Sequence, residues 1–407
     1  MLERRIPEWL RHAPTPSVQG FALLAGFEAI ARGILISVFP LIMYRALQDA
    51  SAVSSAYFQI GIVSLLSGLL VPWLNNFIPR RWLYSGGALL FAFGALLAMM
   101  GTPKLVVIGL ALNAIATATT FVCFNAYVLD YIAKFELGRC ETQRMFYSAL
   151  GWTIGPFAGV TLMAWWHPAP FLIASAAALC MLFVFLYLRF GNGKQITRAK
   201  APATNPLAFL KRFFAQPRLV AGWLFAVLRS CGWWVYVVYL PIFCVQNGLG
   251  EQIGGVVLSL ANGSLFLAPL MLRWTRKRPV RQSVRLGFIA GGILFASAGF
   301  AAGYPPASIA LLLAGSFFLI LLDMVAGLPF LMAVKPSERT EMSAVYASYR
   351  DVSGIFTPGG AWLVLLVAPI QGVFIAGGVA LFAGWMLACS LHPRLGQERT
   401  RTGAAAK

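Results

Sequence analysis

Long runs of apolar residues recur down the whole chain, and they constrain its fold more than any other feature. Runs that reach about 18 residues predict helices that span a membrane. Charged residues make up only 11% of the chain, whereas a soluble domain carries about 25%. The short alternating segments of a membrane β-barrel are not visible. The sequence therefore predicts an all-α polytopic membrane protein.

The apolar runs divide into twelve predicted spans, at residues 19–44, 54–75, 83–101, 105–133, 145–166, 170–189, 219–243, 253–272, 286–303, 307–334, 343–367 and 372–391. An even number of spans puts both termini on one side. The connectors on that side hold 27 Lys and Arg residues, and the opposite connectors hold 2. The positive-inside rule then predicts cytoplasmic termini in an inner-membrane protein. The polar, Pro-containing N-terminus predicts no cleavable signal peptide.

The longest connector predicts how the chain divides into domains. We expect an N-terminal six-helix bundle over residues 1–189, a cytoplasmic middle loop over 190–217, and a C-terminal six-helix bundle with a short tail over 218–407. Within the loop, NPLAFLKRFFAQ is either an amphipathic helix on the inner leaflet or a basic tether between the bundles.

Composition and motifs exclude several functional classes. The net charge of +19 lies in short connectors, which does not favour nucleic-acid binding. The six cysteines have no paired spacing and none of the three histidines is placed mid-membrane, so neither a disulfide framework nor a metal site is expected. No catalytic motif or ATP-binding loop is visible, which argues against an enzyme. Charges of mixed sign disfavour a channel.

An internal repeat relates the two halves of the chain. FEAIARG in the first span matches LFAVLRS in the seventh, which aligns Arg32 with Arg229 at an offset of 197. LDYIAKFELGRCE matches PFLMAVKPSERTE, and GWTIGPFAG in the fifth span matches GIFTPGG in the eleventh. Two parallel repeats predict a binding site between the halves, near the middle of the membrane.

With this layout the chain resembles the major facilitator superfamily over essentially its whole length. The family's usual loop G-x-x-x-D-R-x-G-R-R aligns with PWLNNFIPRR, in which only Arg80 and Arg81 remain and Asn76 replaces the acid. The exporter motif G-x-x-x-G-P-x-x-G is fully matched by Gly151, Gly155, Pro156 and Gly159. The resemblance implies the proton-driven exporter branch. The alternative is that these small residues serve only close helix packing.

Charges inside the predicted spans supply the candidate substrate site. Glu28 and Arg32 are four residues apart and share one helix face. By the resemblance, spans 1, 4, 7 and 10 line a central cavity, so Arg32, Arg229 and Asp323 are expected to face it. Two guanidinium groups there suit a carboxylate or phosphate. Asn113 and Trp233 are further candidate substrate contacts.

Two interpretations of these charges are open. In the first, Glu28 or Asp323 carries a proton, and Glu28 neutralises Arg32 until a substrate anion takes the arginine. In the second, Glu28–Arg32 and Arg229–Asp323 are permanent structural pairs. Candidate gating residues lie nearer the cytoplasmic ends, where they form salt bridges between the halves or remain solvated. They are Arg80, Arg81, Asp130, Arg139, Glu141, Arg144, Arg339, Glu341, Arg350 and Asp351. For Arg350 and Asp351 we expect a latch between the halves, against the second span, and the alternative is substrate contact.

Together these features predict a secondary transporter that works by alternating access. We expect proton-coupled efflux of a small anionic or amphipathic molecule by a monomer in the lipid bilayer, with the proton gradient in place of a cofactor. Proton-coupled uptake of an organic anion is one alternative. Movement of a lysolipid or glycolipid between leaflets is the other.

Overall fold

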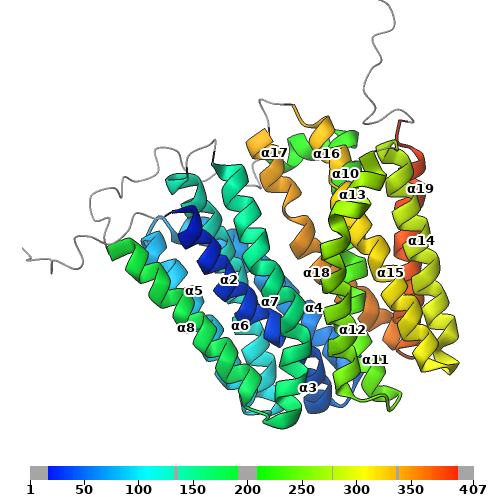
Figure 1. Ribbon diagram of the computed structural model, residues 1–407, viewed down its shortest axis with the longest axis horizontal. Coiled ribbons are helices and arrows are strands. Elements are labelled where there is room, and N and C mark those ends of the chain that lie inside the picture. Colours follow the sequence, from blue (N-terminus) through cyan, green and yellow to red (C-terminus); the bar gives the residue numbers. More distant parts are fainter. Residues whose placement is uncertain (1–16, 133–135, 191–208, 277, 336–338, 393–407) are drawn as a thin grey trace, which may run out of the picture. The chain divides into compact units, whose positions relative to one another are not determined.

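The computed structural model describes residues 17–132, 136–190, 209–276, 278–335 and 339–392 of the 407-residue chain. The described secondary structure is helical throughout (Figure 1). Nine helical spans in this part of the chain are long and apolar enough to cross a membrane. The predicted all-α polytopic membrane fold is confirmed.

The first six predicted spans correspond to seven helices. The first span is divided in two by a turn at residues 36–37, and Asp49 then caps the next helix by accepting bonds from the amides of Ser51 and Ala52, each at 3.0 Å. The helices are α2 Val18–Leu35, α3 Val38–Leu47, α4 Ala50–Leu74, α5 Arg80–Met99, α6 Pro103–Tyr131, α7 Leu137–Trp165 and α8 Ala169–Phe190.

In the second half of the chain, more of the spans are divided into shorter helices. Span 7 contains a π-helical turn over Val235–Tyr239, and span 8 contains a 3₁₀ turn over Ser264–Leu267. The helices are α9 Leu210–Phe214, α10 Pro217–Trp234, α11 Leu240–Gln246, α12 Glu251–Gly263, α13 Ala268–Arg276, α14 Val280–Phe300, α15 Pro305–Val325, α16 Leu328–Ala333, α17 Arg339–Tyr346, α18 Tyr349–Leu365 and α19 Gln371–Cys389. In the middle loop, α9 is shorter than the predicted amphipathic helix, whose first residues lie outside the described ranges.

Packing divides the chain into two compact units. Unit 1 holds Met1–Ala203, Val237–Gly263 and Gly354–Leu366, and unit 2 holds Thr204–Tyr236, Ser264–Ser353 and Val367–Lys407. Unit 1 thus combines the predicted N-terminal bundle with two segments from the second half of the sequence. The bundle boundaries drawn from the sequence stay a prediction.

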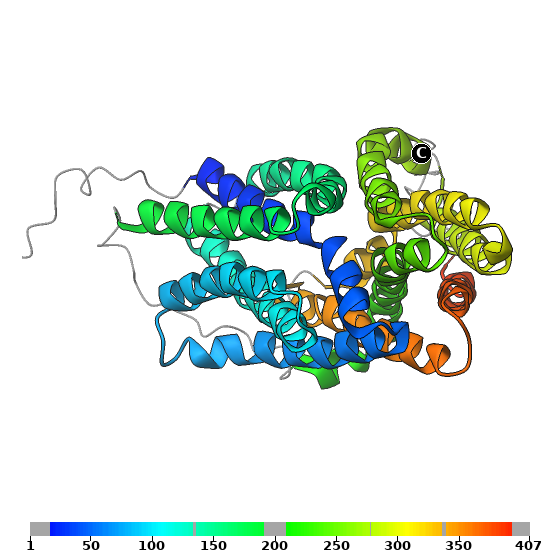
Figure 2. The ribbon, with the colours of Figure 1, turned by 90° about the horizontal axis from the view of Figure 1, so that it is seen from below.

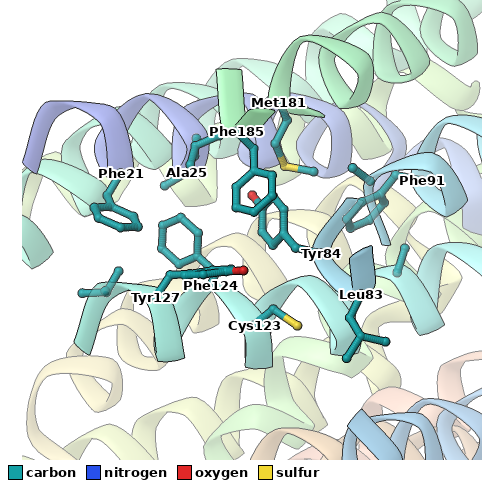
Figure 3. Close-up of a cluster of buried hydrophobic side chains, with 14 of the residues drawn as sticks. Phe21, Ala25, Leu83, Tyr84, Phe91, Cys123, Phe124, Tyr127, Met181 and Phe185 are labelled. Carbon is teal, nitrogen blue, oxygen red and sulfur yellow. The ribbon is translucent and has the colours of Figure 1, made fainter. Parts of the chain in front are cut away.

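Each unit has its own aromatic core. In unit 1, α2, α5, α6 and α8 enclose a cluster that includes Phe21, Tyr84, Phe124 and Phe185 (Figure 3). Tyr84 and Phe185 have ring centroids 4.2 Å apart. In unit 2, Phe330 and Tyr346 stack at 4.0 Å beside the buried Phe213 of α9. Because aromatic rings bury large apolar areas, these clusters fix the helices that carry the charged residues.

Candidate functional site

The glycine motif of α7 seats α2 at very short range. A Cβ on Gly155 would lie 2.5 Å from the backbone carbon of Gly33, and a Cβ on Gly159 would overlap the carbonyl oxygen of Ile34. Ser37, in the turn after α2, donates to the carbonyl of Pro156 at 2.7 Å. Figure 2 shows α2 lying between α7 and α8. The motif therefore fixes the position of the helix that carries Glu28 and Arg32.

The Glu28–Arg32 pair is present on α2. Arg32 Nη1 lies 3.1 Å from Glu28 Oε1, with 32% and 16% of the two side chains exposed. The guanidinium also lies over the ring of Trp152 on α7, 5.2 Å from its centroid. Arg32 is thus held between a carboxylate and an aromatic face, while about a third of its side chain stays exposed.

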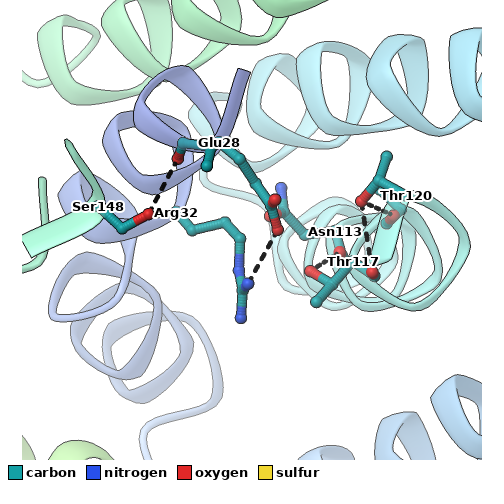
Figure 4. A network of polar contacts seen from close by, with 8 residues as sticks. Glu28, Arg32, Asn113, Thr117, Thr120 and Ser148 are labelled. Atoms are coloured by element: carbon teal, nitrogen blue, oxygen red, sulfur yellow. Dashed lines mark hydrogen bonds and ion pairs between the residues drawn. The ribbon is translucent and has the colours of Figure 1, made fainter. Parts of the chain in front are cut away.

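Polar groups of α6 face this pair (Figure 4). Thr117 and Thr120 donate to their own helix, at 2.8 Å to the carbonyls of Asn113 and Ala116, so these hydroxyls are already used. The Nδ2 of Asn113 is buried and has no hydrogen-bond partner among the described residues. A buried amide without a partner is costly, so Asn113 is the group on α6 best suited to bind a ligand.

A second pair lies in unit 2. Arg229 Nε on α10 is 3.0 Å from Asp323 Oδ1 on α15, and Trp233 Nε1 donates to Asp323 Oδ2 at 3.0 Å. Arg229 also lies over the ring of Tyr349, 5.1 Å from its centroid. Asp323 is therefore held by an ion pair with Arg229 and a hydrogen bond from Trp233, whereas among the described residues Glu28 is paired with Arg32.

The two arginine sites are built alike. In both, a guanidinium from the first helix of a repeat covers an aromatic ring from the fifth. Trp152 and Tyr349 are separated by 197 positions, the same offset that relates Arg32 to Arg229. Sequence reasoning missed the two rings, although applying that offset to the aromatic residues of span 5 would have found them. Only the acids differ in origin, since Glu28 comes from the same helix as its arginine and Asp323 does not.

The candidate gating residues of the first half lie near the starts of α5 and α7 and the end of α6. Arg144 pairs with Glu141 at 2.8 Å and covers Phe124 at 4.6 Å. Arg139 is exposed. Arg80 and Arg81 at the start of α5 lie over the rings of Tyr127 and Trp82. Asp130 lies on α6, but its side chain is outside the described part of the structure.

The candidate gating residues of the second half are placed less completely. Arg350 Nε donates to the hydroxyl of Tyr349 at 3.1 Å, and Asp351 is half-buried on α18. Arg339 and Glu341 lie on α17, and their side chains are outside those described. Arg32 and Arg229 themselves belong to different units. The salt bridges between the halves and the shared cavity remain predictions.

Within unit 1, a set of contacts that the sequence analysis missed joins the two halves of the sequence. Arg45 of α3 forms an ion pair with Glu251 of α12. Nearby contacts reinforce it: Tyr44 with Gln246 at 3.1 Å, the buried hydroxyls of Ser54 and Tyr239 at 2.9 Å, and the amide of Phe157 with Ser259 at 2.9 Å. These residues are far apart in sequence, and no local pattern pairs them.

Comparisons with known proteins agree with this architecture. No curated protein is significantly similar to the chain in sequence. A crystal structure of a variant of the nucleoside transporter NupG is similar with a TM-score of 0.72 at 15% identity, covering 91% of this chain and 98% of that one. A POT family transporter in complex with a thioalcohol-conjugated peptide is similar with a TM-score of 0.68 at 12% identity, covering 91% and 95%. The family model of the Major Facilitator Superfamily matches residues 21–358, and the chain belongs to this family of membrane transporters.

Proposed function

We propose that the protein is a proton-coupled secondary transporter that binds a small solute through an anionic group and exports it by alternating access. Membership of the family indicates a transporter rather than an enzyme. The observation that carries the proposal is the pair of matching arginine sites, one on α2 and one on α10. The protein would lie in the inner membrane with both termini in the cytoplasm, as the charge asymmetry predicts.

Each arginine suits an anion. A guanidinium packed on an aromatic ring keeps its in-plane N–H donors available, and this edge matches a carboxylate or phosphate. Holding a charge inside the membrane costs about 2.5–3.5 kcal/mol on insertion scales, so each arginine needs an acid when no ligand is bound. Glu28 and Asp323 meet that need. A ligand anion would replace an acid as the partner of its arginine.

Glu28 is the better candidate to carry the proton. When a ligand anion binds Arg32, Glu28 loses its ion-pair partner and would be stabilised by protonation, because an unpaired carboxylate is costly in this environment. Asp323 keeps the hydrogen bond from Trp233 even if Arg229 turns to the ligand. We therefore assign exchange of the proton to Glu28 and a fixed counter-charge to Asp323.

The proposed direction is efflux, supported by the match of Gly151, Gly155, Pro156 and Gly159 to the exporter motif. In the structure these residues hold α7 against α2. The nucleoside and peptide transporters named above share the fold at low sequence identity, so we take no substrate from them.

The test is a transport screen in proteoliposomes with an imposed pH gradient and a trapped pH-sensitive dye. Monocarboxylates, dicarboxylates and phosphate esters would be added to wild type, Arg32→Ala and Arg229→Ala. An active anion should drive proton movement in wild type. In each variant the rate of this proton movement should fall at least about tenfold, as expected when a charge-assisted contact worth about 1.5–3 kcal/mol is removed. Lys104→Ala, which removes an exposed charge at the start of α6, is the matched control. Undiminished transport by both arginine variants would refute the anion site.

A further inference from the structure

A groove on the surface of unit 2 lies outside the arginine site. It is formed between α13 and α15 and has a volume of about 330 Å³. Its lining is apolar: Leu270, Met271, Trp274, Phe317, Phe318 and Leu321. Leu270 is 65% exposed, so the groove opens to the surroundings of the unit. In a chain that spans the membrane, an open apolar groove on a spanning helix is accessible to lipid chains.

The groove faces away from the ion pair. Successive residues are about 100° apart around an α-helix. The three lining residues of α15, Phe317, Phe318 and Leu321, therefore lie roughly 120° or more around the helix from Asp323, which contacts Arg229. A ligand in the groove would not share the Arg229–Asp323 site.

Two exposed arginines stand at the end of the groove. Arg273 shares a face of α13 with Leu270 and Trp274, since these positions fall within about 100° of one another. The guanidinium of Arg278 lies over the ring of Trp274, 4.2 Å from its centroid. Both arginine side chains are exposed. Trp274 thus joins the apolar lining to the basic end of the groove.

Two neighbouring arginines are engaged with α19 instead. Arg281 donates to the carbonyl of Cys389 at 2.7 Å, and Arg285 lies over Trp385 at 5.8 Å. This separates a structural pair of basic residues from the exposed pair, Arg273 and Arg278. Arg273 near the end of α13 and Arg278 just after it lie at the end of the span that the charge asymmetry assigns to the cytoplasmic side, where the membrane leaflet is anionic.

We propose that this groove binds one anionic phospholipid of the inner leaflet. An acyl chain fills the apolar groove, the ring of Trp274 lies at the boundary between chain and headgroup, and the phosphate contacts Arg273 and Arg278. Two guanidinium groups favour a headgroup with net negative charge, because a zwitterionic headgroup already carries its own cation. The site is independent of the proposed transport function, and it takes a lipid as a bound ligand rather than as a substrate.

The test is native mass spectrometry of the detergent-purified full-length protein titrated with equal amounts of palmitoyl-oleoyl phosphatidylglycerol and phosphatidylcholine. Wild type should retain one phosphatidylglycerol in preference. Arg273→Gln/Arg278→Gln should weaken that binding about fivefold or more, with phosphatidylcholine unchanged. Lys211→Gln/Arg212→Gln on α9 removes two other basic charges from a cytoplasmic connector and should leave the preference intact.

Two further arms separate the contributions of chain and headgroup. Leu270→Trp, which fills the groove, should weaken binding without changing the arginines. Glycerol phosphate, which offers the headgroup chemistry without a chain, should not displace the lipid. Equal retention of both lipids by wild type, or an unchanged preference in the double arginine variant, would overturn the proposal. So would a dimer that forms through this face and excludes the lipid. None of these readouts depends on transport.

Discussion

At the scale of single residues, the proposed function centres on Arg32 and Arg229. Each guanidinium has an acid on one side and a ring beneath it, so its charge is compensated and its plane is oriented before any ligand binds. Preorganisation of this kind lowers the cost of ordering a flexible side chain on binding. The sites differ in how tightly the acid is held, and this difference can be tested.

Glu28→Gln removes the acid that we assign to proton exchange. The variant should keep substrate counterflow but lose the acceleration that an imposed pH gradient produces, because glutamine cannot exchange a proton. Both rates would be measured in proteoliposomes with the same active anion. Asp323→Asn is the comparison variant and should retain part of the pH-gradient response. Full proton-coupled transport by Glu28→Gln would exclude the assigned role.

At the scale of single helices, packing in the first half depends on how closely two helix backbones can approach. The contact between α2 and α7 needs glycine at several positions, because an added Cβ would meet backbone atoms that cannot move aside. In the second half of the chain, spans 7 and 8 are instead interrupted by irregular helical turns. Two of the five boundaries between the units fall within the π-helical turn Val235–Tyr239 and at the start of the 3₁₀ turn Ser264–Leu267. Irregular helical turns of this kind are frequent at functional sites and hinges.

Gly159→Ala tests the packing of α2 on α7. The new methyl group would overlap the carbonyl oxygen of Ile34, so we expect a destabilisation of about 1–3 kcal/mol, typical of overpacking. The measurement is the apparent unfolding midpoint of the purified protein. Gly86→Ala, on α5, makes the same change where no atom lies within 4 Å of the new Cβ. It should leave the midpoint unchanged or raise it, and an equal loss in both variants would contradict the packing argument.

The sequence predicted the helices well and their contacts only in part. Hydrophobic length places each span, so the predicted ranges agree with the helices to within several residues. The Glu28–Arg32 contact follows from spacing on one helix. The pairing of Arg45 with Glu251 could not be predicted, because it depends on how distant helices pack. The π-helical turn after Trp234 was also missed, since its extra residue leaves no mark in the hydrophobic pattern.

At the scale of the whole molecule, the contacts of α3 with α11 and α12 have the clearest consequence. They tie the end of the first span to two helices from the second half of the sequence, all within unit 1. By the charge asymmetry, this end of the spans is the non-cytoplasmic one. Arg45 is one of the two basic residues in the connectors on that side, and its partner Glu251 begins α12. We expect this ion pair to help hold that side closed.

Exchanging the charges tests this expectation. Arg45→Glu places two acids together and should raise the labelling rate of Cys244, which is fully buried on α11, by a maleimide added from the non-cytoplasmic side. Because the pair is partly exposed, its loss should change the rate by no more than about fivefold, equivalent to roughly 1 kcal/mol. The protein would carry Cys244 as its single cysteine. Arg45→Glu/Glu251→Arg should restore slow labelling, and equal labelling of all three proteins would rule the role out.

The π-helical turn at Val235–Tyr239 gives span 7 a way to change shape without unfolding. Such a turn holds one residue more than an α-helical turn, so returning to the α-helix means slipping the backbone register by one position. The residues that follow the register shift would rotate by about 100° around the helix axis. Tyr239 is one of these residues, and its hydroxyl would then swing out of reach of Ser54. A shift of one residue in the backbone register would thus break the Ser54–Tyr239 contact at one end of the span. Arg229, which precedes the π-helical turn, would stay in place.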